Sequence, residues 1–441
     1  MLTSIDLFSG PGGLATGFRW AGIKPLIAVE WSDHTVQTYS ASHGAEILDL
    51  EGYLKQSDDF VFEKNDNTLL IHGDIRKVTN DLIKKILKER FSVDTVDVVT
   101  GGAPCESFSQ AGKRAEEDER NTLFLNVTRI ARAINSKMFV FENVKGLFSK
   151  KNDGIHGKMF QDICNEFERV TEGEASFHLA SRERNVVLLK ANDYGVPQVR
   201  ERIFLVGINN EFDTEFHYPQ KTHGEGKNFD YVTVDDALKD LPKIDSGQGA
   251  EVLDYHFDYT NLNDKQLDFI TMLHGVKEGF EPPANIEYDV NKITFHKAVN
   301  HREKMIKRMH LIKIGEGMKH AADRLIKENR ANLVSEYFPN KLYAARNRRL
   351  IPDKPSFTVT SHVLDEMIHP YEDRGLTPRE AARLQSFPDW YEFSGPYVKF
   401  HGDIEQDKYE QIGDAIPPLL AYALGVEVSR TLIKIHEKYK S

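Results

Sequence analysis

The chain begins with a short apolar segment that passes directly into a glycine-rich turn, and this feature limits the possible folds most strongly. Ile5–Phe8 (IDLF) is followed by SGPGGLATGF, with glycines at positions 10, 12, 13 and 17. A strand that leads through such a turn into a helix is the cofactor-binding crossover of α/β proteins, because glycine lets the backbone approach a ligand closely. The spacing differs from G-x-G-x-x-G, which argues against a dinucleotide bound through its pyrophosphate.

The first half of the chain continues as alternating strand-like and helix-like segments. Further apolar runs that predict strands are Leu26–Val29, Val96–Val99, Phe139–Phe141, Val186–Leu189 and Ile203–Val206. Between them, Asp81–Arg90 and Thr122–Ala133 are compatible with helices. This alternation predicts a parallel, doubly wound α/β sheet. The C-terminal residues 416–438 predict a long helix with proline in its first turn.

Length and composition exclude several classes of protein. The 441 residues are enough for two domains, and a hydrophobic content of 40% excludes a wholly disordered chain. The two cysteines, Cys105 and Cys164, exclude a disulfide scaffold and a thiolate-rich metal site, and we expect no metal. No apolar run approaches the roughly 18 residues of a membrane helix, and the N-terminus lacks the features of a signal peptide. We therefore expect no membrane segment and a reducing intracellular compartment.

The net charge of −11 conceals a strongly basic block. Residues 231–290 contain 4 Lys/Arg and 13 Asp/Glu, whereas residues 291–350 contain 15 Lys/Arg and 5 Asp/Glu, a net charge of +10. Taken alone, this block is as compatible with a solvated helix face as with a nucleic-acid-binding surface. Within it, Met305, Ile306, Met309 and Ile312 recur at helical spacing and are expected in a core.

Polar residues at two further strand ends favour an adenosine-containing cofactor. Glu30 ends the second predicted strand, 20 residues after the first glycine of the turn, where a carboxylate could bind both ribose hydroxyls. Asp74 lies between Gly73 and Ile75 at another strand end. The turn, Glu30 and Asp74 together favour such a cofactor over a purely structural glycine turn.

Cys105 follows the predicted strand Val96–Val99, where α/β folds place reactive groups. It could be a nucleophile or a small buried hydrophobe, and the polar residues at 106–110 favour a loop over a core. Cys164 fits an apolar helix face and is predicted to be structural. Glu142 and the segment 198–202 (QVRER) adjoin neighbouring predicted strands and are candidates to polarise an electrophile.

Six motifs occur in the order DLFSGPGG, GGAPCESFS, FENV, QVRER, RGLTPREAARLQSFP (374–388) and QIGDAIPP (411–418). From about Ile5 to Leu420 the chain thus resembles the DNA (cytosine-5) methyltransferases of the bacterial restriction-modification type. The resemblance implies an α/β fold with a doubly wound, Rossmann-like, S-adenosylmethionine-dependent methyltransferase domain and a second, smaller target-recognition domain. It also implies sequence-specific methylation at C5 of a flipped-out cytosine, through a covalent bond between a cysteine and C6.

The resemblance implies a role for each matching residue. Cys105 matches the nucleophile, Glu142 the carboxylate at the cytosine N3/N4 edge, Arg202 the arginine at O2, and Arg200 its helper. The implied cofactor-binding residues are Asp6, Phe8, Ser9, Gly10, Gly12, Gly13, Glu30, Trp31, Asp74, Ile75 and Asp414. The implied DNA-binding residues are Ser107, Arg346, Arg348, Arg349, Thr358 and Thr360. Two positions depart from the family pattern: Glu106 replaces its usual glutamine, and Asp414 its usual asparagine.

The family architecture predicts a catalytic domain of residues 1–213, completed by 405–441, and a target-recognition domain of residues 214–404. The expected partner is double-stranded DNA, with a separately acting restriction endonuclease, and the expected state is a monomer in the bacterial cytoplasm, associated with the nucleoid when on DNA. Three alternatives remain open. They are methylation of cytosine in RNA such as transfer RNA, a catalytically silent DNA-binding regulator, and an NAD-linked enzyme with a thiol nucleophile.

Overall fold

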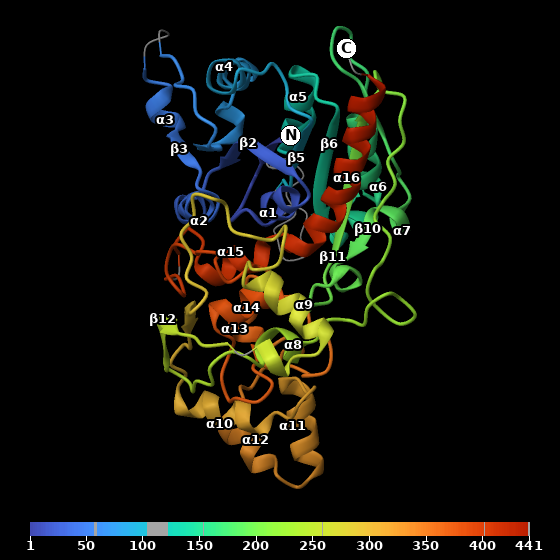
Figure 1. Ribbon diagram of the computed structural model, residues 1–441. Helices are drawn as coiled ribbons and strands as arrows, with labels where there is room; N and C mark the ends of the chain where they lie inside the picture. Colours follow the sequence, from blue (N-terminus) through green and yellow to red (C-terminus); the bar gives the residue numbers. More distant parts are fainter. Residues whose placement is uncertain (57–59, 104–121, 153, 258, 401, 440–441) are drawn as a thin grey trace. The chain divides into compact units, whose positions relative to one another are not determined.

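The computed structural model describes the chain except for residues 57–59, 104–121, 153, 258, 401 and 440–441. Cys105, Glu106 and Ser107 therefore lie outside the described residues. The chain forms two compact units (Figure 1). Unit 1 consists of Met1–Lys190, Glu201–Gln220 and Pro418–Ser441, and unit 2 consists of Ala191–Arg200 and Lys221–Pro417.

The boundaries of these units differ in three places from the expected division. Residues 191–200 and 405–417, both expected in the catalytic domain, cluster with unit 2. Residues 214–220, expected in the target-recognition domain, cluster with unit 1. The C-terminal helix from Pro418 onward belongs to unit 1. As a division into folding domains, residues 1–213 with 405–441 and residues 214–404 stay a prediction.

Unit 1 is built on one large sheet. Its strands are β1 (Leu2–Leu7), β2 (Ile23–Glu30), β3 (Glu46–Asp49), β4 (Leu69–His72), β5 (Val98–Gly101), β6 (Met138–Val144), β9 (Phe177–Leu179), β10 (Leu188–Lys190) and β11 (Glu201–Asn209). Among the described residues these nine strands follow the order β10-β11-β6-β5-β1-β2-β4-β3, with β9 beside β11. The strands from β3 to β6 pair in parallel, and β11 runs antiparallel to its neighbours. The predicted doubly wound α/β fold is confirmed.

Helices cover both faces of this sheet. They are α1 (Gly13–Trp20), α2 (Asp33–His43), α3 (Leu50–Tyr53), α4 (Asn80–Phe91), α5 (Leu125–Ala133), α6 (Lys158–Phe167), α7 (Arg184–Val187) and α16 (Pro418–Lys438), with a small hairpin of β7 (Lys151–Asn152) and β8 (Ile155–His156). Because side chains alternate along a strand, Ala28 of β2 faces α1 and α2, whereas Ile27 and Val29 face α4 to α6. The larger apolar core lies on the α4–α6 face.

Two local predictions need correction. Val186–Leu189 was expected to be one strand, but α7 ends at Val187 and β10 begins at Leu188. The amide groups of Val186 and Val187 both donate to the carbonyl oxygen of Glu183, at 3.0 Å, which closes a helical turn before the strand. Periodicity cannot separate a strand from a helical turn in so short an apolar run. Likewise, α5 begins at Leu125, three residues later than the expected start at Thr122.

Unit 2 combines short helices with small sheets. Its elements are α8 (Val234–Leu238), β12 (Gly249–Asp254), α9 (Asp264–Leu273), β13 (Lys292–Lys297), α10 (Glu303–Leu311), α11 (Met318–Lys327), α12 (Ala331–Tyr337), β14 (Arg348–Arg349), α13 (Val363–Glu366), β15 (Met367–Ile368), α14 (Pro378–Leu384) and α15 (Lys408–Asp414). The LTPRE motif forms the start of α14. Thr377 and Glu380 cap this helix reciprocally, and the Glu380 carboxylate also accepts hydrogen bonds from the buried Arg374, both at 2.8 Å.

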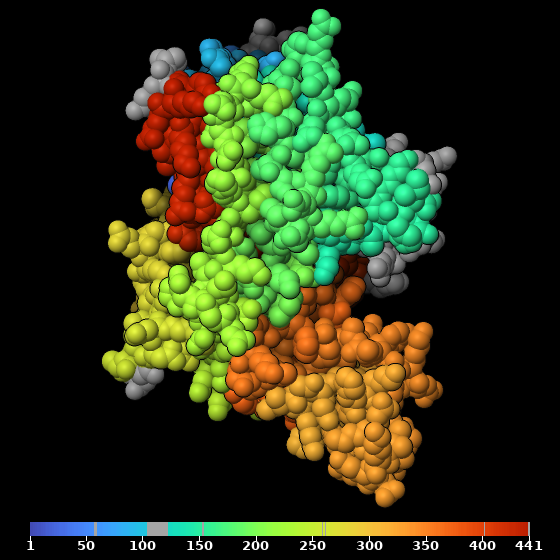
Figure 2. Space-filling model, turned by 90° about the vertical axis from the view of Figure 1, so that its right-hand side faces the viewer, coloured from blue at the N-terminus to red at the C-terminus, as the bar shows by residue number. Residues whose placement is uncertain are grey.

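The basic block contains a helical bundle with its own core. Helices α10 to α12 lie together at one end of unit 2 (Figures 1 and 2). Met309 and Ile312 are almost fully buried there against Met318 and Leu325, as the spacing predicted, whereas Met305 and Ile306 are only partly buried. The apolar face of these helices is thus used inside the bundle, and its charges lie outside.

Residues Lys408–Lys438 include an 18-residue window with a mean hydropathy of 1.2, which is long and apolar enough to cross a membrane by length and composition alone. Of that window, 56% is buried inside the protein. Burial of this extent is that of a core helix.

The C-terminal helix α16 packs directly on α1, and a glycine makes this contact possible. A Cβ atom at Gly17 of α1 would lie 2.4 Å from the carbonyl oxygen of Pro418 and 2.5 Å from the Cβ of Ala421. The far end of α16 is also held, because the Nε2 of His436 lies 2.6 Å from the Asp97 carboxylate just before β5. The glycine at position 17 therefore serves helix packing and not the turn before α1.

We expect Gly17→Ala to lower the free energy of unfolding by about 1–3 kcal/mol, because the added methyl group overpacks the α1–α16 contact. Gly425→Ala is the matched control, since its Cβ would meet Ala21 at 3.0 Å and the Phe18 side chain at 3.3 Å, a milder conflict. Urea unfolding of both variants measures the difference. If both substitutions lower the free energy of unfolding equally, Gly17 is not the closest approach between α1 and α16.

Candidate active site

The turn after β1 has the backbone conformation that its glycines allow. Gly10 has φ 54° and Gly12 has φ 98°, both in the left-handed region. Phe8 also has a positive φ, of 54°, although it carries a side chain. The Ser9 amide donates to the carbonyl oxygen of Val29 at 3.1 Å, which ties the turn to the end of β2. Gly13 begins α1, so the turn ends at a helix N-terminus.

Glu30 holds this turn in place. Its carboxylate accepts hydrogen bonds from the amides of Gly10 at 2.9 Å, Trp31 at 2.8 Å and Ser32 at 3.1 Å. The residue is buried, and burial raises the pKa of its carboxyl group against the opposing effect of these amides. The predicted ribose-binding carboxylate therefore also fixes the loop on which it would act.

Asp6 lies beside this turn as a second buried carboxylate. It is 2% exposed, and its Oδ1 accepts a hydrogen bond from the Thr100 hydroxyl at 2.8 Å. Its Oδ2 and the Oγ of Ser9 are buried without a hydrogen-bond partner among the described residues. Burial, with a smaller contribution from the negative charge of Glu30, raises the pKa of Asp6 to about 7.

The remaining predicted cofactor residues of unit 1 differ in their surroundings. Trp31 is 52% exposed, whereas Ile75 is buried. Asp74 accepts hydrogen bonds from the Arg76 amide at 2.9 Å and from its Nε at 2.9–3.0 Å. These contacts lower the pKa of Asp74. In unit 2, Asp414 accepts a hydrogen bond from the Nε2 of Gln406 at 2.9 Å.

The antiparallel pairing of β6 with β11 brings Glu142 and Arg202 together. Glu142 pairs with Phe204, and Arg202 pairs with Val144, so the two side chains are diagonal neighbours. The Arg202 Nε lies 2.9 Å from the Glu142 Oε1, and the side chains are 13% and 12% exposed. A carboxyl group and a guanidinium group fixed in this way can hold the polar edge of a planar heterocycle.

The same carboxyl group lies against the end of β5. A Cβ atom at Gly102 would be 2.8 Å from the Oε2 of Glu142, so a side chain at this position would displace the carboxyl group. Cys105 follows Gly102 by three residues and lies outside the described residues. The described geometry thus supports the predicted Glu142–Arg202 part of the site and leaves the cysteine as a prediction.

Arg200 has a positioning role within unit 2. Its side chain is 1% exposed, and it donates to the carbonyl oxygens of Val359 at 2.7 Å and Gly413 at 2.8 Å. These bonds tie the segment around Val359 to the end of α15. The resemblance had implied a helper of Arg202, and the described contacts are with the backbone of unit 2.

Gln198 opens the candidate segment 198–202, and no role of its own was predicted for this residue from the sequence. It is fully buried, its Oε1 accepts from the Val359 amide at 2.9 Å, and its Nε2 donates to the Leu384 carbonyl at 2.9 Å. With Arg200 it fixes both sides of the backbone of Val359. The position of this glutamine at the start of the QVRER motif is the only sequence feature that points to this role.

The three predicted DNA-binding arginines are not equivalent. Arg346 is exposed, with 56% of its side chain accessible, and its Cζ lies 5.4 Å from the centre of the Tyr343 ring. Arg349 is 5% exposed, and its five N–H groups donate to protein acceptors. These acceptors are the carbonyl oxygens of Met309, Ile312, His369 and Glu372 and the Asp373 carboxylate, at 2.6–2.9 Å. The structure therefore corrects the interpretation of Arg349, which anchors α10 instead of offering donors to DNA.

The two predicted DNA-binding threonines lie on the segment that Gln198 and Arg200 hold. The Thr358 hydroxyl donates to the carbonyl oxygen of Val199 at 2.5 Å. The Thr360 hydroxyl donates to the Glu366 carboxylate at 2.9 Å. Both hydroxyl groups keep acceptor capacity, and Ser107 lies outside the described residues.

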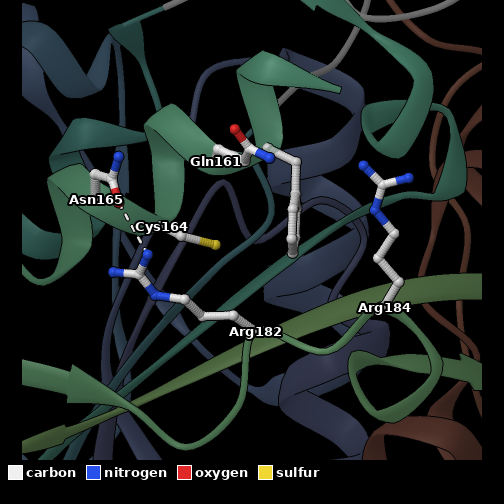
Figure 3. A pocket seen from close by; sticks show the side chains of 6 residues that line it. Gln161, Cys164, Asn165, Arg182 and Arg184 are labelled. Atoms are coloured by element: carbon white, nitrogen blue, oxygen red, sulfur yellow. Dashed lines mark hydrogen bonds between the residues drawn. The ribbon is translucent and has the colours of Figure 1, made fainter. Parts of the chain in front are cut away.

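The second cysteine lines a separate cavity of about 390 Å³ in unit 1 (Figure 3). Cys164 is 1% exposed on α6, and burial raises the pKa of its thiol to about 12. In Figure 3 the Arg182 side chain reaches back to Asn165 of α6, at 2.9 Å from its Oδ1. A deeply buried, protonated thiol is a packing group, in agreement with the prediction that Cys164 is structural.

Comparison with known proteins identifies the group to which these features belong. The sequence model of the family "C-5 cytosine-specific DNA methylase" matches residues 2–53 and 54–430. The chain is 31% identical over 429 residues to the Type II methyltransferase M.DdeI of Desulfomicrobium norvegicum, covering 96% of this chain and 88% of that protein. It is 30% identical to the Type II methyltransferase M1.HphI of Haemophilus parahaemolyticus, covering 97% and 86%.

A solved structure shares the fold. A prophage-encoded DNA modification methyltransferase from Escherichia coli matches 98% of this chain and 100% of its own, with a TM-score of 0.67 and 24% identity. The agreement over nearly the whole of both chains shows that the fold of this chain is not a local resemblance around the glycine turn.

Asp6 predicts a specific dependence of stability on pH. Its ordinary pKa of 3.8 rises to about 7 in the folded state, so between these values the folded protein binds a proton that the unfolded chain has lost. This contribution to stability is complete below pH of about 4 and is lost as the pH rises to about 7. Asp6→Asn has no carboxyl group to titrate, so its free energy of unfolding should not fall in this way. In urea unfolding, the difference in free energy between the variant and the parent should therefore shift in favour of the variant from pH 5 to pH 7. Asp66→Asn, at an exposed position, is the control, and its stability should follow that of the parent across this pH range. If the stability of Asp6→Asn also runs parallel to that of the parent, the prediction is wrong.

Proposed function

The chain belongs to the C-5 cytosine-specific DNA methylase family, and on this basis we propose which of its residues carry out DNA cytosine-5 methylation. The single observation that carries the assignment is the Glu142–Arg202 pair, held 2.9 Å apart at adjoining ends of β6 and β11. Gly102 leads from the same place into the segment of Cys105. A carboxyl group, a guanidinium group and a thiol are the three groups that the reaction requires.

S-adenosylmethionine is the proposed methyl donor, and the residues at the turn after β1 fit it. Asp6 and Ser9 offer buried oxygen atoms without a partner among the described residues, which suit a ligand with a cationic amino-acid part. A side chain built at Gly10 would meet nothing within 4 Å, so there is open space beside the turn. When bound, the donor supplies an electrophilic methyl group.

The proposed cofactor residues divide by the part of the donor they would hold. Phe8, Trp31, Asp74 and Ile75 would hold the adenine, and Glu30 the ribose. Asp6, Ser9, Gly10, Gly12 and Gly13 would line the remainder, and Asp414 stays a cofactor residue proposed from the sequence resemblance. Because Glu30 already binds three backbone amides, its loss would disturb the turn as well as the ribose contact.

The chemistry of the cytosine ring explains the residue types. C5 is a poor nucleophile, so addition of the Cys105 thiolate to C6 pushes electrons toward C5, which then takes the methyl group. Negative charge builds on the ring, where a protonated Glu142 at N3 and the cationic Arg202 at O2 would stabilise it. Loss of the C5 proton and expulsion of Cys105 restore the ring. The base must first be extruded from the duplex.

Double-stranded DNA is the proposed substrate and unit 2 its proposed reading surface. The net charge of +10 over residues 291–350 supplies phosphate contacts. Arg346 and Arg348, with Thr358 and Thr360, are the proposed contacts among the described residues, and Ser107 is proposed from the sequence. The family match supports DNA as the substrate, and the relatives' names, Type II methyltransferases, support a role in restriction-modification. A separate endonuclease is the proposed partner and a monomer the proposed state. Methylation of RNA and a silent regulatory role are not favoured.

Cys105→Ser should abolish methyl transfer, because a hydroxyl is a far weaker nucleophile than a thiolate at C6. Binding of DNA should persist, since phosphate contacts dominate affinity. Transfer of labelled methyl groups to DNA, with a mobility-shift assay beside it, measures both. Cys164→Ser is the matched control and should stay active, because Cys164 lies in a separate buried site.

DNA with 5-fluorocytosine at the methylated position tests the same thiol directly. Fluorine blocks the final elimination, so the parent protein should remain covalently attached and the Cys105→Ser variant should not. Substantial turnover by Cys105→Ser, or no adduct with the parent on a site that is otherwise methylated, would remove the proposed mechanism.

Glu142→Gln should lower the rate of methyl transfer by about 10²-fold or more, since an amide cannot deliver the proton that neutralises charge at N3. The amide keeps the size of the side chain beside Gly102 and can still accept a bond from Arg202. DNA affinity should change far less than the rate. Single-turnover rates and binding constants for both proteins decide the matter, and an equal loss in the two quantities would assign Glu142 a structural role instead.

A further inference from the structure

Two neighbouring arginines of β14 differ in what their guanidinium groups bind. All five N–H groups of Arg349 donate to protein acceptors. Arg348 is 24% exposed, and its Nε is buried without a hydrogen-bond partner among the described residues. Its charge contact with Glu366 is long, with 3.9 Å between the Arg348 Nη2 and the Glu366 Oε2. The two Nη groups of Arg348 also have no hydrogen bond among the described residues, and unlike the Nε they are not buried, so a ligand can supply their acceptors.

The Phe357 ring lies against this guanidinium group. The Cζ of Arg348 lies 4.1 Å from the centre of the Phe357 ring, which is a close stacking distance. Ser356, next to Phe357, pairs with Gln198 in a β-bridge, and Val359 beyond it is held by Gln198 and Arg200. The ring therefore stands on backbone that is pinned on both sides, and the arginine fork is oriented before any DNA arrives.

Glu366 is the counter-ion of the same group. Its Oε2 accepts the Thr360 hydroxyl at 2.9 Å, which directs the carboxylate toward Arg348 at the end of α13. The carboxylate is 17% exposed, so it repels phosphate and other acceptors that approach Arg348 from solvent. A ligand must therefore offer more than one acceptor to compete with it.

We propose that Phe357 and Glu366 are positioning residues that make Arg348 a reader of guanine at one position of the target. Guanine presents O6 and N7 side by side in the major groove, which matches a pre-oriented arginine fork. The other bases offer no such pair of acceptors, so their contacts with Arg348 are too weak to replace its contact with Glu366. This inference rests on the proposed function of the chain as a DNA methyltransferase.

The test is the methylation pattern of a plasmid library with a randomised stretch, taken from cells that lack cytosine methylation of their own and read by bisulfite sequencing. The parent should require guanine at one position besides the methylated cytosine. Phe357→Leu, which keeps apolar bulk but removes the ring face, should lower the preference for guanine there by about tenfold. Phe357→Tyr keeps the ring and should keep the preference.

Two further variants test the same position from the other side. Arg348→Lys provides a charge without the fork and should relax the same position as Phe357→Leu. Glu366→Gln should relax it too, because the charge that repels other acceptors from Arg348 is lost. Glu336→Gln, on the exposed surface of α12, makes the same charge change and should leave the pattern as it is.

The outcomes distinguish failure of the proposed function from failure of the inference about Arg348. If the parent methylates no cytosine in the library, the proposed function fails. If the parent methylates specifically but Phe357→Leu, Arg348→Lys and Glu366→Gln lower all sites by one factor, or relax different positions, the inference is overturned and the function stands. If Phe357→Tyr is impaired to the same degree as Phe357→Leu, the ring face is not what orients the arginine, and the inference is overturned as well.

Discussion

The antiparallel pairing of β11 with β6 is the constraint on which the proposed chemistry depends. Its register sets Glu142 opposite Phe204 and Arg202 opposite Val144, so the carboxyl and guanidinium groups stand on one face as diagonal neighbours. A slip by one residue would turn one of the two to the opposite face, because side chains alternate along a strand. The buried residues that follow along β11, Ile203–Asn209, hold this register from within the sheet.

Much of unit 1 could be predicted from the sequence because local patterns determine it. Most of the apolar runs form strands. The spacing between the glycine turn and Glu30 predicted a carboxylate near the turn, and the Glu30 carboxylate indeed accepts a hydrogen bond from the Gly10 amide. The pattern failed at Val186 and Val187, where an apolar run of four residues formed a helical turn and then a strand. A buried helical turn and a buried strand both need apolar residues, so the sequence pattern cannot distinguish them here. The backbone hydrogen bonds to Glu183 favour the helical turn.

The arginine cluster shows what the sequence could not determine. Arg346, Arg348 and Arg349 have the same chemistry and lie within four residues, and charge counting treats them alike. Whether an arginine offers its donors to DNA depends on which carbonyl groups the fold brings to it, and those at Met309, Ile312, His369 and Glu372 are up to 40 residues away in sequence. A contact of this kind leaves no local trace, and Arg349 was therefore misassigned.

The QVRER motif has more than one function within five residues. Gln198 and Arg200 bind the backbone around Val359 in unit 2, whereas Arg202 pairs with Glu142 in unit 1. The chain passes from one unit to the other between Arg200 and Glu201. Within five residues the motif thus holds the segment that carries Phe357 in unit 2 and supplies the guanidinium group proposed to face the cytosine in unit 1. A residue changed at 198 or 200 should therefore act on recognition through Val359, and one changed at 202 on the reacting ring, although all three belong to a single sequence motif.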